Sequence, residues 1–129
     1  RGPVYRDISA EVLATQWTSS GGDEVYRPEQ QLRAQLTLDT RWLRRFPTGE
    51  FGFKASGAID HRSGAVFPGA GGITTLASTV VSALVEIRIQ DAIAFVQSRN
   101  TLAVDYEEVP GFLLPRNVIL YGVRWQFWN

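Results

Sequence analysis

Residues 31–42, QLRAQLTLDTRW, alternate between apolar and polar side chains over their whole length. This period of two places successive side chains on opposite faces of an extended chain, whereas an amphipathic helix repeats its apolar residues every three to four positions. The segment is therefore predicted to be a β-strand with one apolar face, which carries Leu32, Leu36 and Leu38, and one polar face.

The same alternation returns, less strictly, along the rest of the chain. VSALVEIRIQ (residues 81–90) repeats it with one exception, Leu84, and the last nine residues, YGVRWQFWN, repeat it with aromatic side chains. We predict an all-β fold, an antiparallel up-and-down meander of about six long strands in one unit, 1–129, with no signal peptide. The predicted strands are 5–17, 30–43, 51–61, 76–90, 92–101 and 117–128.

The connections between these strands alternate in length. Residues 18–29, 61–75 and 102–116 are long and contain Gly, Pro or charged residues, whereas residues 43–50 and the turn at Gln90 are short. Long loops at one end of a meander and short turns at the other are typical of a transmembrane β-barrel. The predicted strands of about 10–15 residues also exceed the five or six usual in soluble proteins and suffice to cross the hydrocarbon region. We therefore expect the meander to be part of a transmembrane barrel.

Aromatic residues gather near the predicted strand ends, as in the two aromatic girdles of a membrane barrel. We predict that Trp17, Trp42, Phe46, Phe51 and Trp128 lie at the membrane interfaces. A soluble β-sandwich also has alternating strands, and its core could hold the same aromatics, so a sandwich binding module remains an alternative.

Charge and composition exclude several function classes. Thirteen basic and thirteen acidic residues give no net charge, so no overall field favours nucleic acid. With no cysteine and one histidine, the chain cannot form a thiolate or histidine-cluster metal site. We predict no cofactor and no resident metal. The pairs Asp23–Glu24 and Glu107–Glu108, with Asp105, lack the spacing of a calcium loop.

No catalytic constellation emerges from the sequence, and we predict that the chain is not an enzyme. His61 and Ser63 lack an identifiable third group to orient them, and the Gly-rich GAGGITT lacks the Gly-Lys-Ser/Thr of a phosphate loop. The arginines on the polar faces could contact an anionic solute, but pairing with carboxylates on neighbouring strands is the commoner arrangement. These arginines are Arg33, Arg41, Arg88 and Arg124, and the carboxylates are Asp39, Asp60 and Glu86.

The last third of the chain, residues 86–129, resembles the C-terminal end of TonB-dependent outer-membrane receptors. In that family a strand ends near an Asn, a loop with a Tyr and a Pro-Gly-aromatic-x-x-Pro segment follows, and a closing strand ends in aromatics. The matching residues here are Asn100, Tyr106, Pro110, Gly111, Phe112, Pro115, Arg116, Gly122 and the final aromatics. The resemblance implies a bacterial outer-membrane location and a role in the uptake of a small solute.

The resemblance also implies partners. A closing strand of this form is similar to the signal that the barrel-assembly machinery reads by strand addition, which assigns that role to Tyr121, Val123, Trp125 and Phe127. The family's plug domain and TonB box are not among the 129 residues, and about six strands are fewer than a closed barrel needs. Open strand edges cannot face lipid, so we expect the remaining strands of a receptor, or other chains of an envelope complex in which this chain is a structural subunit, to complete the wall.

Overall fold

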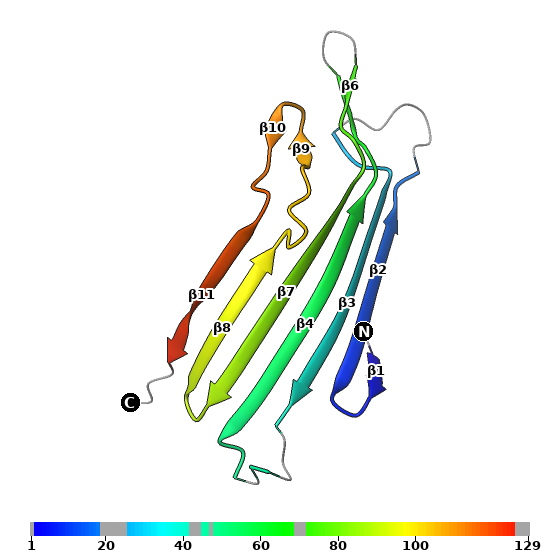
Figure 1. Ribbon diagram of the computed structural model, residues 1–129. Helices are drawn as coiled ribbons and strands as arrows, with labels where there is room; N and C mark the ends of the chain where they lie inside the picture. Colours follow the sequence, from blue (N-terminus) through cyan, green and yellow to red (C-terminus); the bar gives the residue numbers. More distant parts are fainter. Residues whose placement is uncertain (1, 19–25, 42–44, 47, 69–71, 126–129) are drawn as a thin grey trace.

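The computed structural model describes residues 2–18, 26–41, 45–46, 48–68 and 72–125. Every regular element among these residues is a β-strand. Seven strands form one antiparallel sheet in the order β1-β2-β3-β4-β7-β8-β11 (Figure 1). They are β1 (Gly2–Tyr5), β2 (Ile8–Gln16), β3 (Gln30–Thr40), β4 (Phe51–Arg62), β7 (Ser78–Ile89), β8 (Ala92–Arg99) and β11 (Val118–Trp125).

The long strands pair in uninterrupted register. The central pair, β4 and β7, is matched along twelve positions, from Phe51 opposite Ile89 to Arg62 opposite Ser78. Because no bulge interrupts this pairing, the two-residue alternation of each sequence segment is preserved across the sheet, and apolar residues meet apolar residues on the same face. The prediction of an all-β antiparallel meander is confirmed.

The predicted number of strands is wrong, because the sheet has seven strands where about six were expected. The additional strand is β1, which overlaps the expected first strand, 5–17, only at Tyr5; a tight turn at Arg6 and Asp7 joins it to β2, with Tyr5 paired to Ile8. Arg6 adopts a positive φ of 41°, and the carbonyl of Asp7 accepts a hydrogen bond from the amide of Asp39. A sequence pattern misses this turn because neither turn residue is the Gly or Asn that positive φ favours.

The long connections contain two small hairpins that were not predicted. β5 (Val66–Phe67) pairs with β6 (Ile73–Thr74), and β9 (Glu107–Val109) pairs with β10 (Phe112–Leu113). Both hairpins extend from the same end of the sheet, and the short turns lie at the opposite end (Figure 1). The predicted alternation of long and short connections is therefore confirmed.

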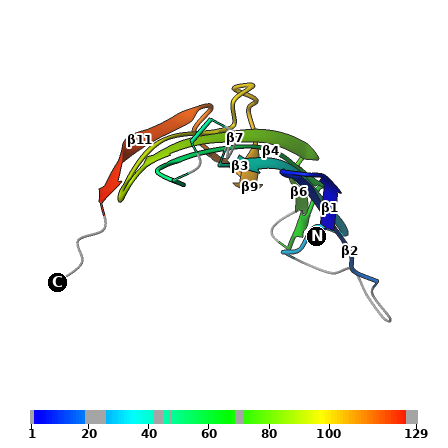
Figure 2. The same cartoon turned by 90° about the horizontal axis from the view of Figure 1, so that it is seen from below.

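The sheet is a single curved layer. Seen from below, the strands follow an arch (Figure 2). A sandwich would bury one face under a second sheet, but only Ala65, Val80 and Tyr106 are buried apolar residues in the described part of the chain. Within the described ranges no helix is long and apolar enough to cross a membrane.

Both edges of the sheet are open among the described residues. β11 pairs with β8 on one side only, along all eight of its positions. At the other edge, β1 pairs with β2 only from Ala10 back to Ile8, so Glu11–Gln16 pair with β3 alone. The sheet therefore does not close into a barrel by itself.

Candidate functional site

One face of the sheet is apolar from edge to edge. Val85, Val96 and Tyr121 form one cross-strand row on β7, β8 and β11, and the next rows are Ile87 with Ala94 and Val123, and Ile89 with Ala92 and Trp125. Aromatic and β-branched residues directly opposite each other stabilise a sheet through side-chain contact. We call this surface the outer face.

The outer face is largely uncovered. Twelve of its large apolar side chains have exposed fractions of at least 37%, rising to 80% for Tyr121. Contiguous apolar patches of this extent mark surfaces that bind protein or lipid. The residues are Val12, Leu32, Leu36, Ile59, Val85, Ile87, Ile89, Val96, Ile119, Tyr121, Val123 and Trp125.

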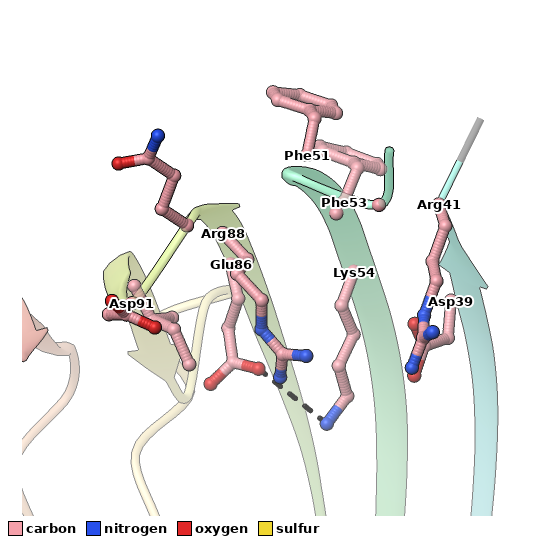
Figure 3. Close-up of a pocket in the computed structure, with 12 residues that line it drawn as sticks. Asp39, Arg41, Phe51, Phe53, Lys54, Glu86, Arg88 and Asp91 are labelled. Carbon is pink, nitrogen blue, oxygen red and sulfur yellow. Dashed lines mark ion pairs between the residues drawn. The ribbon is translucent and has the colours of Figure 1, made fainter. Parts of the chain in front are cut away.

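The opposite face, which we call the inner face, carries the charged residues of the long strands, together with a few apolar residues, Leu13, Val80, Leu84 and Leu120. Asp39, Lys54 and Glu86 are direct cross-strand neighbours on β3, β4 and β7. Nζ of Lys54 lies 3.6 Å from Oε2 of Glu86 (Figure 3), and the Glu86 side chain is only 16% exposed. This face is the concave one, because both hollows described below are lined by its residues.

On the inner face, an ion pair between Arg124 and Glu86 connects β11 to β7 across the intervening strand β8. The guanidinium of Arg124 reaches across β8 and donates from Nη2 to Oε1 of Glu86 on β7. On the way it lies 5.2 Å from the centre of the Phe95 ring, a cation–π distance. Phe95 in turn covers Gly122, where a Cβ would lie 3.2 Å from the ring. Because Gly122 has no side chain, the Phe95 ring can lie over it, in the position where the ring contacts Arg124.

The first hollow of the inner face lies at the short-turn end and has a volume of about 600 Å³. Figure 3 shows the charged side chains of three neighbouring strands around it, with Arg41 and Asp39 on one side and Arg88 and Glu86 on the other. Positive and negative groups are mixed here, so the hollow has no strong preference for one charge.

The second hollow lies toward the long-loop end, with a volume of about 320 Å³. The β9 hairpin covers it, because Tyr106 and Glu108 line it together with strand residues. Nη1 of Arg62 donates to Oε1 of Glu108 at 2.9 Å, and Nε of Arg62 lies 3.5 Å from Oδ1 of Asp60. Both carboxylates of this hollow are thus paired with one arginine.

The predicted pairing of inner-face arginines with carboxylates holds for Arg124 alone, and its partner lies two strands away. Arg33, Arg41 and Arg88 form no ion pair with any residue in the described ranges. The prediction is wrong for these three because Asp60 turns toward Arg62, its neighbour on the same face of β4, and Glu86 is taken by Lys54 and Arg124.

Asn100 organises the long loop between β8 and β11. Its side chain is 1% exposed, donates to the carbonyl of Val104 at 2.7 Å and accepts from the amide of Val104 at 3.0 Å. Nδ2 also lies 3.4 Å from the carbonyl of Pro115, at the other end of the loop. Asn tolerates the left-handed backbone found here, φ 55°, better than most residues. One side chain thus holds both ends of the loop.

A second pair reinforces this loop. Arg116 donates from Nε and Nη2 to the two carboxylate oxygens of Asp105, at 2.5 and 2.7 Å. These hydrogen bonds, with the charge of Arg116, lower the pKa of Asp105 from its ordinary value, while the carboxylate raises the pKa of Arg116. Tyr106, one of the residues that carry the family resemblance, is buried, and its carbonyl accepts from the amide of Leu114 at 3.0 Å.

The predicted interface aromatics are only partly described. Trp17 is half-buried just after β2, and Phe46 packs on Phe51 with ring centres 5.0 Å apart. Trp42 and Trp128 lie outside the described residues, as does Phe127 of the predicted assembly strand. Tyr121, Val123 and Trp125 of that strand lie together on the outer face of β11.

The other candidate residues from the sequence analysis form hydrogen bonds with nearby residues. Nδ1 of His61 is hydrogen-bonded to Thr79 at 2.8 Å, whereas Oγ of Ser63 accepts from the amide of Gln30. Carboxylate Oε2 of Glu107 accepts from the amide of Gly111. In the described parts of the chain, no group of three or more Asp, Glu or His side chains could hold a metal ion, and Asp23 and Glu24 are outside those parts.

Comparisons with models of known protein families, with curated proteins and with solved structures found no match.

Proposed function

We propose that the chain forms part of the wall of a bacterial outer-membrane β-barrel, with the outer face toward lipid and the inner face toward the lumen. The observation that carries this proposal is the separation of the two faces. Twelve large apolar side chains are exposed on the outer face, while the charged residues of the same strands point into a concave surface. Exposed apolar area is unfavourable in water and favourable against hydrocarbon.

Strand length and connection length also support this proposal. β3, β4 and β7 have 11, 12 and 12 residues, enough for tilted strands to cross the hydrocarbon region. The short turns lie at one end of the sheet and the longer, hairpin-containing connections at the other, as in bacterial barrels with periplasmic turns and extracellular loops.

The resemblance of residues 86–129 to TonB-dependent receptors suggests the biological role. We propose that the chain contributes the C-terminal strands of such a receptor and serves the uptake of a small solute without catalysing a reaction. Tyr121, Val123 and Trp125 on the unpaired β11 are then the strand that the barrel-assembly machinery recognises by strand addition.

The open edges favour a second candidate in which this chain is a structural subunit. Unpaired backbone groups cannot face lipid, so strands must be added beside β11 and beside Glu11–Gln16 of β2. These strands come from the rest of a receptor in the first case and from other chains of an envelope complex in the second. The mass of the detergent-solubilised particle, and whether it contains one polypeptide or several, separates the two.

Site-directed spin labelling tests the orientation of the faces. The chain has no cysteine, so single cysteines can be placed along β7 at Val85 on the outer face and at its neighbour Leu84 on the inner face. In lipid vesicles we expect the label at residue 85 to be accessible to oxygen, which dissolves in hydrocarbon, and the label at residue 84 to be accessible to a water-soluble nickel complex.

Labels at residues 83 and 82 repeat the comparison near the middle of the strand. If the outer-face labels are shielded from both relaxation agents, a protein core covers the outer face and the membrane proposal is wrong. The same result, with a monomer that is soluble without detergent, would support the soluble sandwich module.

A further inference from the structure

The second hollow has an unusual balance of paired and unpaired groups. Of its three arginines, Arg62 takes both carboxylates, Asp60 and Glu108. Arg33 and Arg99 line the same hollow, and their guanidinium groups form no ion pair or hydrogen bond with any described residue. The hollow therefore has one more arginine than carboxylates, and two of its guanidinium groups are free of ion pairs with described residues.

The neutral side chains of the hollow add further donors. Ser78, Ser82 and Gln97 line it between the two arginines, and each carries a hydroxyl or amide group that can donate a hydrogen bond. Guanidinium groups bind carboxylates and phosphates with planar, paired hydrogen bonds. An anionic group is the ligand chemistry that these donors fit.

One acceptor of the hollow lacks a donor. Oδ1 of Asp60 is buried and accepts no hydrogen bond within the described structure, because the nearest cationic nitrogen, Nε of Arg62, lies 3.5 Å away. This oxygen is closed to solvent and therefore to a ligand, but the Asp60 side chain is 26% exposed, so the accessible part of its carboxylate can accept a hydrogen bond at the wall of the hollow. A hydroxyl group on the ligand supplies such a donor.

We propose that this hollow binds a small hydroxylated organic anion, with its anionic groups on Arg33 and Arg99 and its hydroxyl on the accessible part of the Asp60 carboxylate. The β9 hairpin closes the hollow on the long-loop side through Tyr106 and Glu108, so the ligand sits where a solute from that side first meets the inner face. The inference deepens the proposed function by naming a solute class, and it rests on that function for the inner face being a solute path.

The test is a calorimetric titration of the full chain in an uncharged detergent, with its β-structure verified by circular dichroism. Malate and succinate are the probes, because they differ by a single hydroxyl group. We expect malate to bind at least about tenfold more tightly than succinate, the preference that one hydrogen bond to a charged carboxylate supplies.

Four variants locate the site. Arg33→Gln and Arg99→Gln should each weaken malate binding by about tenfold or more, since each loses a charge-assisted hydrogen bond. Arg6→Gln makes the same charge change at the β1–β2 turn, outside the hollow, and should leave binding unchanged. Asp60→Ala should abolish the preference for malate and keep the binding of succinate.

Two results overturn the inference: no binding of either probe to the folded chain, or binding that is equal for malate and succinate and falls equally in all three arginine variants. The second result indicates attraction by general charge only. If malate does not bind but the spin labels alternate as expected, the proposed function stands and only the binding site is wrong. If malate binds specifically but the spin labels do not alternate, the membrane role is wrong and the binding site stands.

Discussion

Replacing Ala83 by Arg distinguishes lipid from water on the outer face with little steric disturbance. Ala83 is exposed, and its partner on β4 is Gly57, which has no side chain and open space above it. A long side chain at this position meets no atoms that must move. Any loss of stability therefore reports the medium around the charge.

The expected magnitude follows from the depth of the residue. Ala83 is the sixth of twelve residues in β7, so it lies roughly 17–20 Å along the strand from either end and, after tilting, near the middle of an apolar band about 25 Å tall. An arginine on the lipid face at this depth costs about 2–4 kcal/mol. A solvent-exposed substitution changes the free energy of unfolding by less than about 0.5 kcal/mol.

Urea or guanidinium unfolding in lipid vesicles, followed by tryptophan fluorescence, measures this difference. Gln97→Arg is the matched control, because Gln97 is exposed on the inner face and precedes Ser98, the partner of Ala83 on β8. It introduces the same charge at nearly the same depth but into the concave surface. We expect the control to lose less than about 1 kcal/mol, including repulsion from Arg99 two residues along.

The reasoning is refuted if Ala83→Arg costs no more than Gln97→Arg in vesicles. Equal and small effects mean that both faces are in water. A large effect of Ala83→Arg that persists in plain buffer, without lipid or detergent, means that a protein surface covers Ala83.

Three further predictions concern the parts around this sheet, each measured by urea unfolding. Asn100→Ala should lose about 2–3 kcal/mol, because two backbone groups lose their buried partner. Gly122→Ala should destabilise by about 1 kcal/mol against the Phe95 ring, whereas Gly57→Ala, with open space, should stabilise by about 0.5–1 kcal/mol. The ion pair with Arg116 lowers the folded-state pKa of Asp105. The parent chain should therefore be more stable than Asp105→Asn above about pH 4, the unfolded pKa, and this difference should vanish as the pH falls through the folded-state pKa. A stability difference that is unchanged at low pH contradicts the ion pair.

Side-chain alternation was sufficient to predict which face each strand residue occupies. The pattern of residues 31–42 extends through the register, so that Leu36 and Ala83 lie on the outer face, while Lys54 and Glu86 lie on the inner face. This succeeds because the period of a strand is two and no bulge interrupts the long pairs. The strand boundaries were less accurate at the first strand, where the turn at Arg6 breaks no pattern.

Ion-pair partners could not be predicted in the same way. Alternation places Arg124 and Glu86 on one face, but only the curvature of the sheet and the room above Gly122 let the side chain cross β8. Likewise, Arg33 and Asp60 are direct neighbours in register, yet Asp60 lies against Arg62. The candidate anion site therefore required side-chain positions, because the sequence does not tell which arginines lack partners.

The hydrogen bonds of Asn100 fix the two ends of the loop between β8 and β11 relative to each other. Because one side chain at the end of β8 holds Val104 and Pro115 together, the residues between them can change in length and sequence without shifting β11 against β8. The loop can then acquire new contacts through sequence changes while the pairing of β8 with β11 stays the same.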